Sequence, residues 1–92
     1  MNYVYIVECV DGTLYTGWTV DIAKRLACHN DGTGAKYTRG RGPVTLVYCE
    51  EHQTMQAALK REREIKRYPK KRKLLLCEGF RQFPDFLSQL TE

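Results

Sequence analysis

Two short runs rich in β-branched and aromatic residues, at positions 2–9 and 13–18, flank a single Asp11-Gly12 pair. Alternating runs of this kind, joined by an Asp-Gly turn, predict a β-hairpin. The hairpin constrains the fold more than any other feature, because its register decides which side chains share a face of the sheet. A shift of one residue would move every side chain of a strand to the opposite face.

The length of the hairpin loop sets that register. A two-residue Asp-Gly loop would put Tyr5 and Tyr15 on opposite faces. A three-residue loop, with its glycine in the left-handed conformation, pairs Cys9 with Thr13 and places both phenols on one face. Tyr5 then lies opposite Gly17, which we expect to leave open space beside the phenol. We predict the three-residue loop.

A first helix is predicted over residues 21–30, with a polar residue at its N-terminal cap. Arg25 and His29 are spaced i and i+4, so they lie on one side of this helix, along the edge of its apolar stripe. The side chains expected on the buried side are Ile22, Ala23 and Leu26. We therefore expect Arg25 and His29 to face the rim of the sheet.

A glycine-rich, basic connection follows at residues 31–42. Its glycines permit close approach of the backbone to a ligand. The side chains that could meet phosphate and base are Lys36, Tyr37, Arg39 and Arg41. A flexible loop that happens to be basic is the alternative interpretation.

The second half of the chain predicts a strand over residues 44–50 and a helix over residues 54–68. The apolar face of this helix consists of Met55, Ala58, Leu59 and Ile65. Glu62 falls within that arc, where an ionised carboxylate is costly unless it is paired or bound to metal. An ion pair of Glu62 with Lys66 or Arg25 is the alternative to a metal site.

Pro69 is placed to begin another helix, and the apolar residues near the end of the chain predict a last packed segment. The predicted fold class is α+β, a three-stranded antiparallel sheet flanked by helices. Its elements are expected in the order strand, strand, helix, strand, helix, helix. We expect residues 1–92 to form a single domain, with 81–92 as a C-terminal tail packed on the core.

The charge of the chain is unevenly distributed. Residues 60–73 carry nine Lys or Arg against two Glu, whereas residues 1–34 are net acidic. A one-sided basic surface is typical of proteins that bind a polyanion. Within this cluster, the residues that we expect to contact nucleic acid are Lys66, Lys70 and Lys73. A solvated helix face is the alternative interpretation.

No feature of the sequence indicates a membrane or an oxidising compartment. No apolar run approaches the length of a membrane span, and no secretory signal is visible. The four cysteines are widely spaced and form no CxxC pair, so they do not have a zinc-binding pattern. We expect free thiols and a cytoplasmic protein.

The ordered set of these residues resembles the GIY-YIG nuclease domain. Val4-Tyr5 stands where that family has Ile-Tyr, and Tyr15-Thr16-Gly17 stands where it has Tyr-Ile-Gly. The similarity extends over essentially the whole chain. It is strongest with the small stand-alone bacterial branch, the UPF0213-like proteins. The resemblance implies the GIY-YIG endonuclease fold.

The resemblance also implies roles for single residues. Arg25 and His29 match the family's helix residues, and Glu62 matches its metal-binding glutamate. One Mg²⁺ or Mn²⁺ ion is then expected at Glu62, with water and phosphate oxygens completing its shell. Arg25 would clamp the phosphate, and Tyr5 or Tyr15 would take the proton from the attacking water. His29 would relay a proton or orient a tyrosine.

The implied function is a divalent-metal-dependent endonuclease that hydrolyses phosphodiester bonds in DNA, with branched or structured DNA among the candidate substrates. The alternative is a non-catalytic DNA- or RNA-binding module on the same fold, with Glu62 tied to Lys66. We expect DNA rather than RNA as the ligand, and a monomer. No second DNA-targeting domain is visible in the sequence, so a partner protein is a candidate source of targeting.

Overall fold

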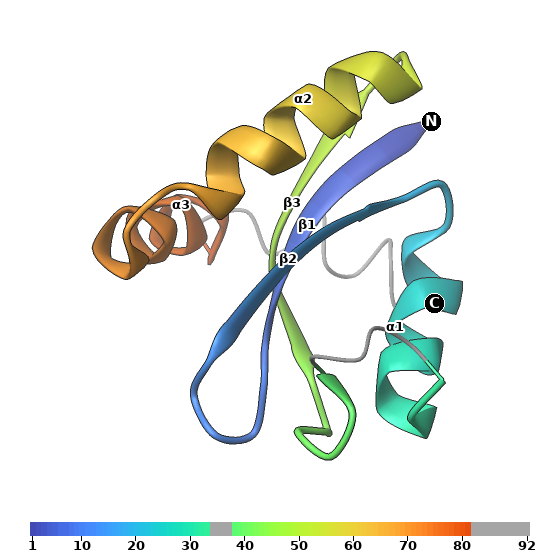
Figure 1. Ribbon diagram of the computed structural model, residues 1–92, viewed down its shortest axis with the longest axis vertical. Coiled ribbons are helices and arrows are strands. Elements are labelled where there is room, and N and C mark those ends of the chain that lie inside the picture. Colours follow the sequence, from blue (N-terminus) through green and yellow to red (C-terminus); the bar gives the residue numbers. More distant parts are fainter. Residues whose placement is uncertain (34–37, 82–92) are drawn as a thin grey trace.

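A single small sheet organises the computed structural model, which describes residues 1–33 and 38–81. The strands pair antiparallel in the order β2-β1-β3, so β1 lies in the centre. The elements are β1 (Asn2–Glu8), β2 (Leu14–Thr19), α1 (Ile22–Asp31), β3 (Thr45–His52), α2 (Met55–Lys66) and α3 (Lys70–Arg81). Helix α1 lies on one side of the sheet, and α2 and α3 lie on the other (Figure 1). This arrangement confirms the predicted α+β architecture.

The β1–β2 hairpin has the three-residue loop that the sequence predicts. The N–H of Cys9 donates to the carbonyl of Thr13 at 2.8 Å, and the loop glycine has a φ of 84°. In the resulting register Tyr5 pairs with Gly17. Because side chains alternate along a strand, Tyr5 and Tyr15 therefore share the face of the sheet that α1 covers.

Each face of the sheet has its own apolar core. The buried residues of the first cluster are Tyr5, Val7, Cys9, Ile22, Val44, Leu46, Cys49 and Phe80. Those of the second cluster, beneath α2 and α3, are Val4, Ile6, Val47, Ala58, Ile65 and Cys77. A β-bulge opposite Ile6 and Val7 shifts the β1–β3 register. No local pattern in the sequence predicts this bulge, which adds one residue to β3 and increases the local twist.

Polar caps begin the first two helices close to the predicted positions. The Asp21 side chain accepts from the N–H of Lys24 at 3.0 Å, ahead of α1. The Thr54 hydroxyl accepts from the N–H of Ala57 at 3.1 Å, ahead of α2. Such caps satisfy backbone donors that have no partner within the helix. They fix where α1 and α2 start, and hence which residues face the sheet.

Two side chains predicted on buried helix faces are exposed. Ala23 is exposed because α1 contacts the sheet along a line of side chains spaced i, i+4 and i+7, namely Ile22, Leu26 and His29. His29 is thus buried on the contact line, and not at its edge. Met55 is exposed because it occupies the first position of α2.

Helix α3 follows Pro69, as the sequence predicts, and it buries Cys77 and Phe80. Leu74 and Leu75 on the same helix are exposed. The predicted tail from residue 82 onward lies outside the described residues, as do Lys36 and Tyr37 of the basic connection. Within the described residues, no helix is long and apolar enough to cross a membrane.

Candidate active site

A pocket of about 280 Å³ opens where the second half of β2 meets α1 and α2. It brings together residues from four elements that are distant in the sequence. The lining residues are Tyr5, Tyr15, Gly17, Trp18, Thr19, Val20, Arg25 and Glu62. Four of the five residues predicted to be catalytic therefore meet at one pocket. The fifth, His29, lies directly behind it.

His29 connects the pocket to the protein interior. Its Nε2 is 2.8 Å from the hydroxyl of Tyr5, and its Nδ1 is 2.8 Å from the hydroxyl of Thr38. Burial, together with the nearby Arg25 guanidinium, lowers the pKa of His29, so the ring is neutral at pH 7. A neutral imidazole has one donor and one acceptor nitrogen. His29 therefore donates to one hydroxyl and accepts from the other.

Thr38 is a site residue for which the sequence pattern predicts no role. Its side chain is buried, and its hydroxyl is the contact that orients the far nitrogen of His29. Thr38 belongs to the basic connection, nine residues beyond His29, where no periodic pattern marks a single position. Only the tertiary structure brings the two side chains together.

The phenol of Tyr5 lies against Gly17. A Cβ added at Gly17 would stand 2.6 Å from the Tyr5 hydroxyl oxygen. The expectation of open space beside the phenol is therefore wrong, because the phenol itself fills that space. Burial raises the pKa of Tyr5 well above its ordinary value; Tyr15 adds to the rise and Arg25 opposes it. The Tyr5 phenol is protonated at neutral pH.

Arg25 supplies positive charge at the rim of the pocket. Its side chain projects from α1 and is exposed, and it forms no ion pair with any residue in the described parts of the chain. Its charge lowers the pKa values of both Tyr5 and His29. A free guanidinium in this position is suited to bind an anion, because its planar fork matches phosphate oxygens.

Among the described residues that line this pocket, Glu62 supplies the only carboxylate. Its side chain is 14% exposed, and Lys66 lies 3.6 Å away as an ion-pair partner. Both the predicted inward orientation and the alternative ion pair with Lys66 are thus observed. Because Lys66 is half exposed and the contact is long, the pair contributes little to stability and can exchange.

The side-chain ligands at this pocket fit a hard divalent cation only if substrate oxygens also ligate the ion. In residues 1–33 and 38–81, no group of three or more His, Cys, Asp or Glu could hold a metal ion. Mg²⁺ in phosphate chemistry is typically bound by one or two carboxylates, with phosphate and water oxygens completing the shell. The single carboxylate of Glu62 beside an open pocket fits this kind of site.

A second polar cluster, which the sequence pattern did not predict, anchors α2 to β3. Arg61 Nε lies 3.1 and 3.2 Å from the two Glu50 carboxylate oxygens, which also contact Tyr48 and His52. Burial alone would raise the pKa of Glu50, but these hydrogen bonds outweigh burial and lower it. Because Arg61 precedes Glu62, the anchor fixes the rotation of α2 that points Glu62 into the pocket.

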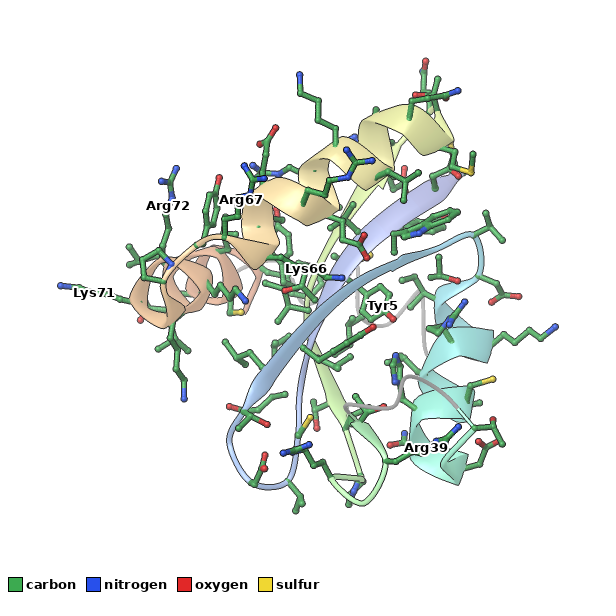
Figure 2. All side chains as sticks on the ribbon, in the orientation of Figure 1. Tyr5, Arg39, Lys66, Arg67, Lys71 and Arg72 are labelled. Carbon is green, nitrogen blue, oxygen red and sulfur yellow. The ribbon has the colours of Figure 1, made fainter. Side chains whose placement is uncertain are left out.

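The predicted nucleic-acid residues that the structure describes come from separate parts of the fold. Lys66 points from α2 toward β2 and Tyr5, whereas Arg39 lies near the C-terminal end of α1 (Figure 2). Arg41 pairs with Asp11 at the hairpin tip, with Arg41 Nε 3.1 Å from Asp11 Oδ2. The basic connection therefore reaches the hairpin on one side of the molecule.

Lys70 and Lys73 approach the same hairpin from the other side. Lys70 Nζ donates to the carbonyl of Gly12 at 3.3 Å. Lys70 and Lys73 line a hollow of about 220 Å³ together with Thr13 and Leu14 at the start of β2. The hairpin tip is thus flanked by basic side chains from two distant segments.

Comparison with known proteins places this chain in a family of nuclease type. The chain matches the GIY-YIG catalytic domain over residues 1–74, so it belongs to that family. Within the family, the relatives of this chain include UPF0213 proteins. A UPF0213 protein from Haloquadratum walsbyi is 57% identical over 77 residues, which cover 84% of this chain and 86% of the relative. A UPF0213 protein from Clostridium perfringens is 55% identical, with 86% and 85% covered.

Two solution NMR structures have the same fold. A UPF0213 protein from Bacillus halodurans superimposes with a TM-score of 0.55 at 46% identity, covering 85% of this chain and 84% of that chain. A protein from E. faecalis superimposes with a TM-score of 0.59 at 37% identity, covering 88% and 86%. These comparisons confirm the family and the branch that the sequence resembles.

Proposed function

We propose that this protein is a divalent-metal-dependent endonuclease that hydrolyses phosphodiester bonds in DNA. The observation that carries the proposal is the meeting of Arg25, Glu62 and the two tyrosines at one pocket, with His29 hydrogen-bonded to Tyr5 behind it. A guanidinium binds a phosphate, a carboxylate holds a hard cation, and a phenol–imidazole pair moves a proton. Each group therefore has a distinct role in phosphodiester hydrolysis.

The raised pKa of Tyr5 favours a relay over a free phenolate base. In the tautomer with the proton on Nδ1, His29 donates to Thr38, and its Nε2 accepts from the Tyr5 hydroxyl. As water attacks phosphorus, Tyr5 takes a proton from the water and gives its own proton to Nε2. The new phosphorus–oxygen bond forms while the bond to the leaving oxygen breaks. Among the protein side chains only His29 gains charge; the leaving oxygen carries the balancing negative charge until it takes up a proton from water.

The other two side chains bind the substrate and the cation. Arg25 would clamp the non-bridging oxygens of the phosphate through forked, charge-assisted hydrogen bonds. Glu62 would hold the Mg²⁺ or Mn²⁺ ion. When bound, such an ion stabilises the charge that develops on the phosphate and the leaving oxygen. Lys66, released from Glu62, would remain beside the pocket as a further positive charge.

Cleavage assays test the proposal directly. Purified protein is incubated with Mn²⁺ and a panel of single-stranded, duplex, flap and junction DNA, with RNA counterparts. We expect Mn²⁺-dependent cleavage of at least one DNA member, and weaker cleavage of RNA. Absence of cleavage on every member, at protein concentrations that saturate binding, would contradict the endonuclease proposal.

One contact favours a second function, a DNA- or RNA-binding module without catalysis. Lys66 Nζ lies 3.6 Å from Glu62 Oε2, so the carboxylate already has a cationic partner. In that case Mn²⁺ would change neither the resonances near the pocket nor the affinity for nucleic acid. Paramagnetic broadening by Mn²⁺ in NMR spectra separates the two functions, because only a metal site places the ion near Glu62.

Salt dependence tests the nucleic-acid contacts of the basic connection. We expect affinity for DNA to fall steeply between about 50 and 200 mM salt, because each phosphate contact releases counterions. Arg39→Glu should lower both the affinity and the slope of log K against log salt. Arg39 is the cleaner probe because Arg41 also pairs with Asp11. An unchanged slope for Arg39→Glu would remove this connection from the DNA-binding surface.

Acid should destabilise the protein through His29. Its pKa is lowered in the folded state, so the unfolded chain binds more protons once the pH falls below about 6.5. Stability is therefore fully present above that pH and is lost as the pH falls through the window below it. We expect chemical denaturation between pH 7 and 5 to show this loss, and His29→Gln to remove most of it. Glu50 titrates later, since an unfolded glutamate has a pKa of about 4.3.

A further inference from the structure

Two hollows lie one after the other along β2. The first, at the start of the strand, is lined by Thr13, Leu14, Lys70 and Lys73. The second is the candidate active site, whose lining includes Gly17 in the later half of the strand. An antiparallel strand rises about 3.4 Å per residue, so Gly17 lies about 12 Å along β2 from the Thr13–Leu14 pair. The strand therefore links a lysine-lined site to the catalytic pocket.

The lysines near these two hollows lie on the sides of α2 and α3 that face β2. Lys70 Nζ reaches the backbone of the hairpin tip, and Lys73 lies on the same side of α3 one turn later. Lys66 extends from α2 toward β2, near the active site (Figure 2). By contrast, Lys71 and Arg72 point away from β2 on the outer side of α3 (Figure 2). The basic cluster is thus divided into an inner and an outer group.

The inner lysines are available to an anion. Neither Lys70 nor Lys73 forms an ion pair with a residue of the described segments. The nearby Asp11 carboxylate is offset by Arg41, at 3.1 Å. An ammonium group is a compact point charge that binds phosphate without a fixed orientation. Two such groups around one small hollow favour a backbone phosphate over a base.

We propose that the cut strand of DNA lies along β2, with the scissile phosphate in the active site and a second phosphate of the same strand between Lys70 and Lys73. This inference rests on the proposed endonuclease function. One strand of B-form DNA rises about 3.4 Å per nucleotide, so about 12 Å corresponds to at most about four nucleotides. The second phosphate therefore lies two to four nucleotides from the cleavage point, on one side only.

Matched double variants test this path. Lys70→Ala/Lys73→Ala removes two inner charges, and Arg67→Ala/Lys71→Ala removes two charges on side chains that point away from β2 (Figure 2). Binding of single-stranded DNA is measured without metal, as a function of salt. We expect the inner variant to reduce the salt slope by about 1.4, about 0.7 for each lost phosphate contact, and the outer variant to leave it nearly unchanged. Equal reductions in both variants would overturn the proposal.

Neutral phosphates locate the contact along the strand. A methylphosphonate is placed in turn at each position on either side of the cleavage point, with Mn²⁺ present. We expect about tenfold weaker cleavage at limiting substrate when it lies two to four nucleotides away on one side, since a charged hydrogen bond is lost. In the inner variant, a methylphosphonate at that position should not weaken cleavage further. The path would be contradicted if methylphosphonates weakened cleavage on both sides of the cleavage point. It would also be contradicted if they weakened cleavage equally in the Lys70→Ala/Lys73→Ala variant.

The two proposals fail separately. Cleavage that is unaffected by Lys70→Ala/Lys73→Ala leaves the endonuclease standing and removes the second phosphate site. Binding that depends on the inner lysines, in a protein that never cleaves, removes the endonuclease function and keeps the inner group as the DNA-binding surface. Thermal unfolding of both double variants checks that each is folded. Both changes are at exposed or half-buried positions, where substitutions usually change stability little.

Discussion

Glu62→Gln should abolish Mn²⁺-dependent cleavage while leaving the protein folded and able to bind DNA. Glutamine keeps the shape of the side chain but removes the charge that a cation needs. Loss of a metal ligand removes several kcal/mol of transition-state stabilisation, and each 1.36 kcal/mol corresponds to a factor of ten in rate. We therefore expect a loss of about a thousandfold or more in the single-turnover cleavage rate.

The same variant should have nearly the stability of the parent. Lys66, the ion-pair partner of Glu62, is half exposed. Breaking the ion pair therefore leaves a solvated ammonium and costs at most about 1 kcal/mol of unfolding free energy. Affinity for DNA should be equal or slightly higher, because one negative charge is removed beside the phosphate site. Thermal unfolding and fluorescence anisotropy measure the two quantities.

Glu64→Gln is the matched control. Glu64 lies on the same helix two residues further along, and it pairs with Arg61 at 3.3 Å, outside the pocket. Both variants remove one carboxylate and one ion pair from α2. Cleavage by Glu64→Gln should equal that of the parent. Equal cleavage by Glu62→Gln and Glu64→Gln would show that Glu62 holds no catalytic cation.

Gly17→Ala should both destabilise the protein and impair catalysis. The new methyl group would stand 2.6 Å from the hydroxyl oxygen of Tyr5 and 2.8 Å from its ring carbon Cζ. The ring must move, which strains the core and breaks the hydrogen bond to His29. Overpacking and the loss of a buried hydrogen bond together cost about 2–4 kcal/mol of unfolding free energy. For a chain of this size, Tm should fall by about 10 °C or more.

Two comparisons make this prediction specific to the phenol. Gly79→Ala adds the same methyl group on α3, where no atom lies within 4 Å, so its Tm should equal or exceed that of the parent. Adding Tyr5→Phe to Gly17→Ala removes the nearest atom and should restore part of the lost stability, but not cleavage. A Gly17→Ala protein as stable as Gly79→Ala would refute the close approach of Tyr5.

Local sequence patterns determined the strands, the helices and the side-chain register. The Asp-Gly turn and the alternation around it were enough to place Tyr5 opposite Gly17, because hairpin register depends on loop length and on a period of two. Helix periodicity placed Glu62 on the inward arc of α2 and Arg25 one turn before His29. The resemblance to the GIY-YIG domain then supplied the set of candidate site residues, and the family match confirms that resemblance.

Helix faces were predicted less well, since periodicity gives the apolar arc but not the line along which a helix touches the sheet. Ala23 lies within the arc of α1 and yet is exposed, while His29, expected at the edge, is buried on the contact line. That line depends on the crossing of α1 over the twisted sheet, which no local pattern encodes.

Only the tertiary structure decided the contacts between distant segments. Thr38 meets His29, Glu50 meets Arg61, and the Tyr5 phenol occupies the space above Gly17. Each contact joins elements whose relative position is set by packing on both faces of the sheet, and the sequence has no short-range signal for such pairs. The division of the basic cluster into inner and outer lysines has the same origin, because it depends on how α3 packs beside the hairpin.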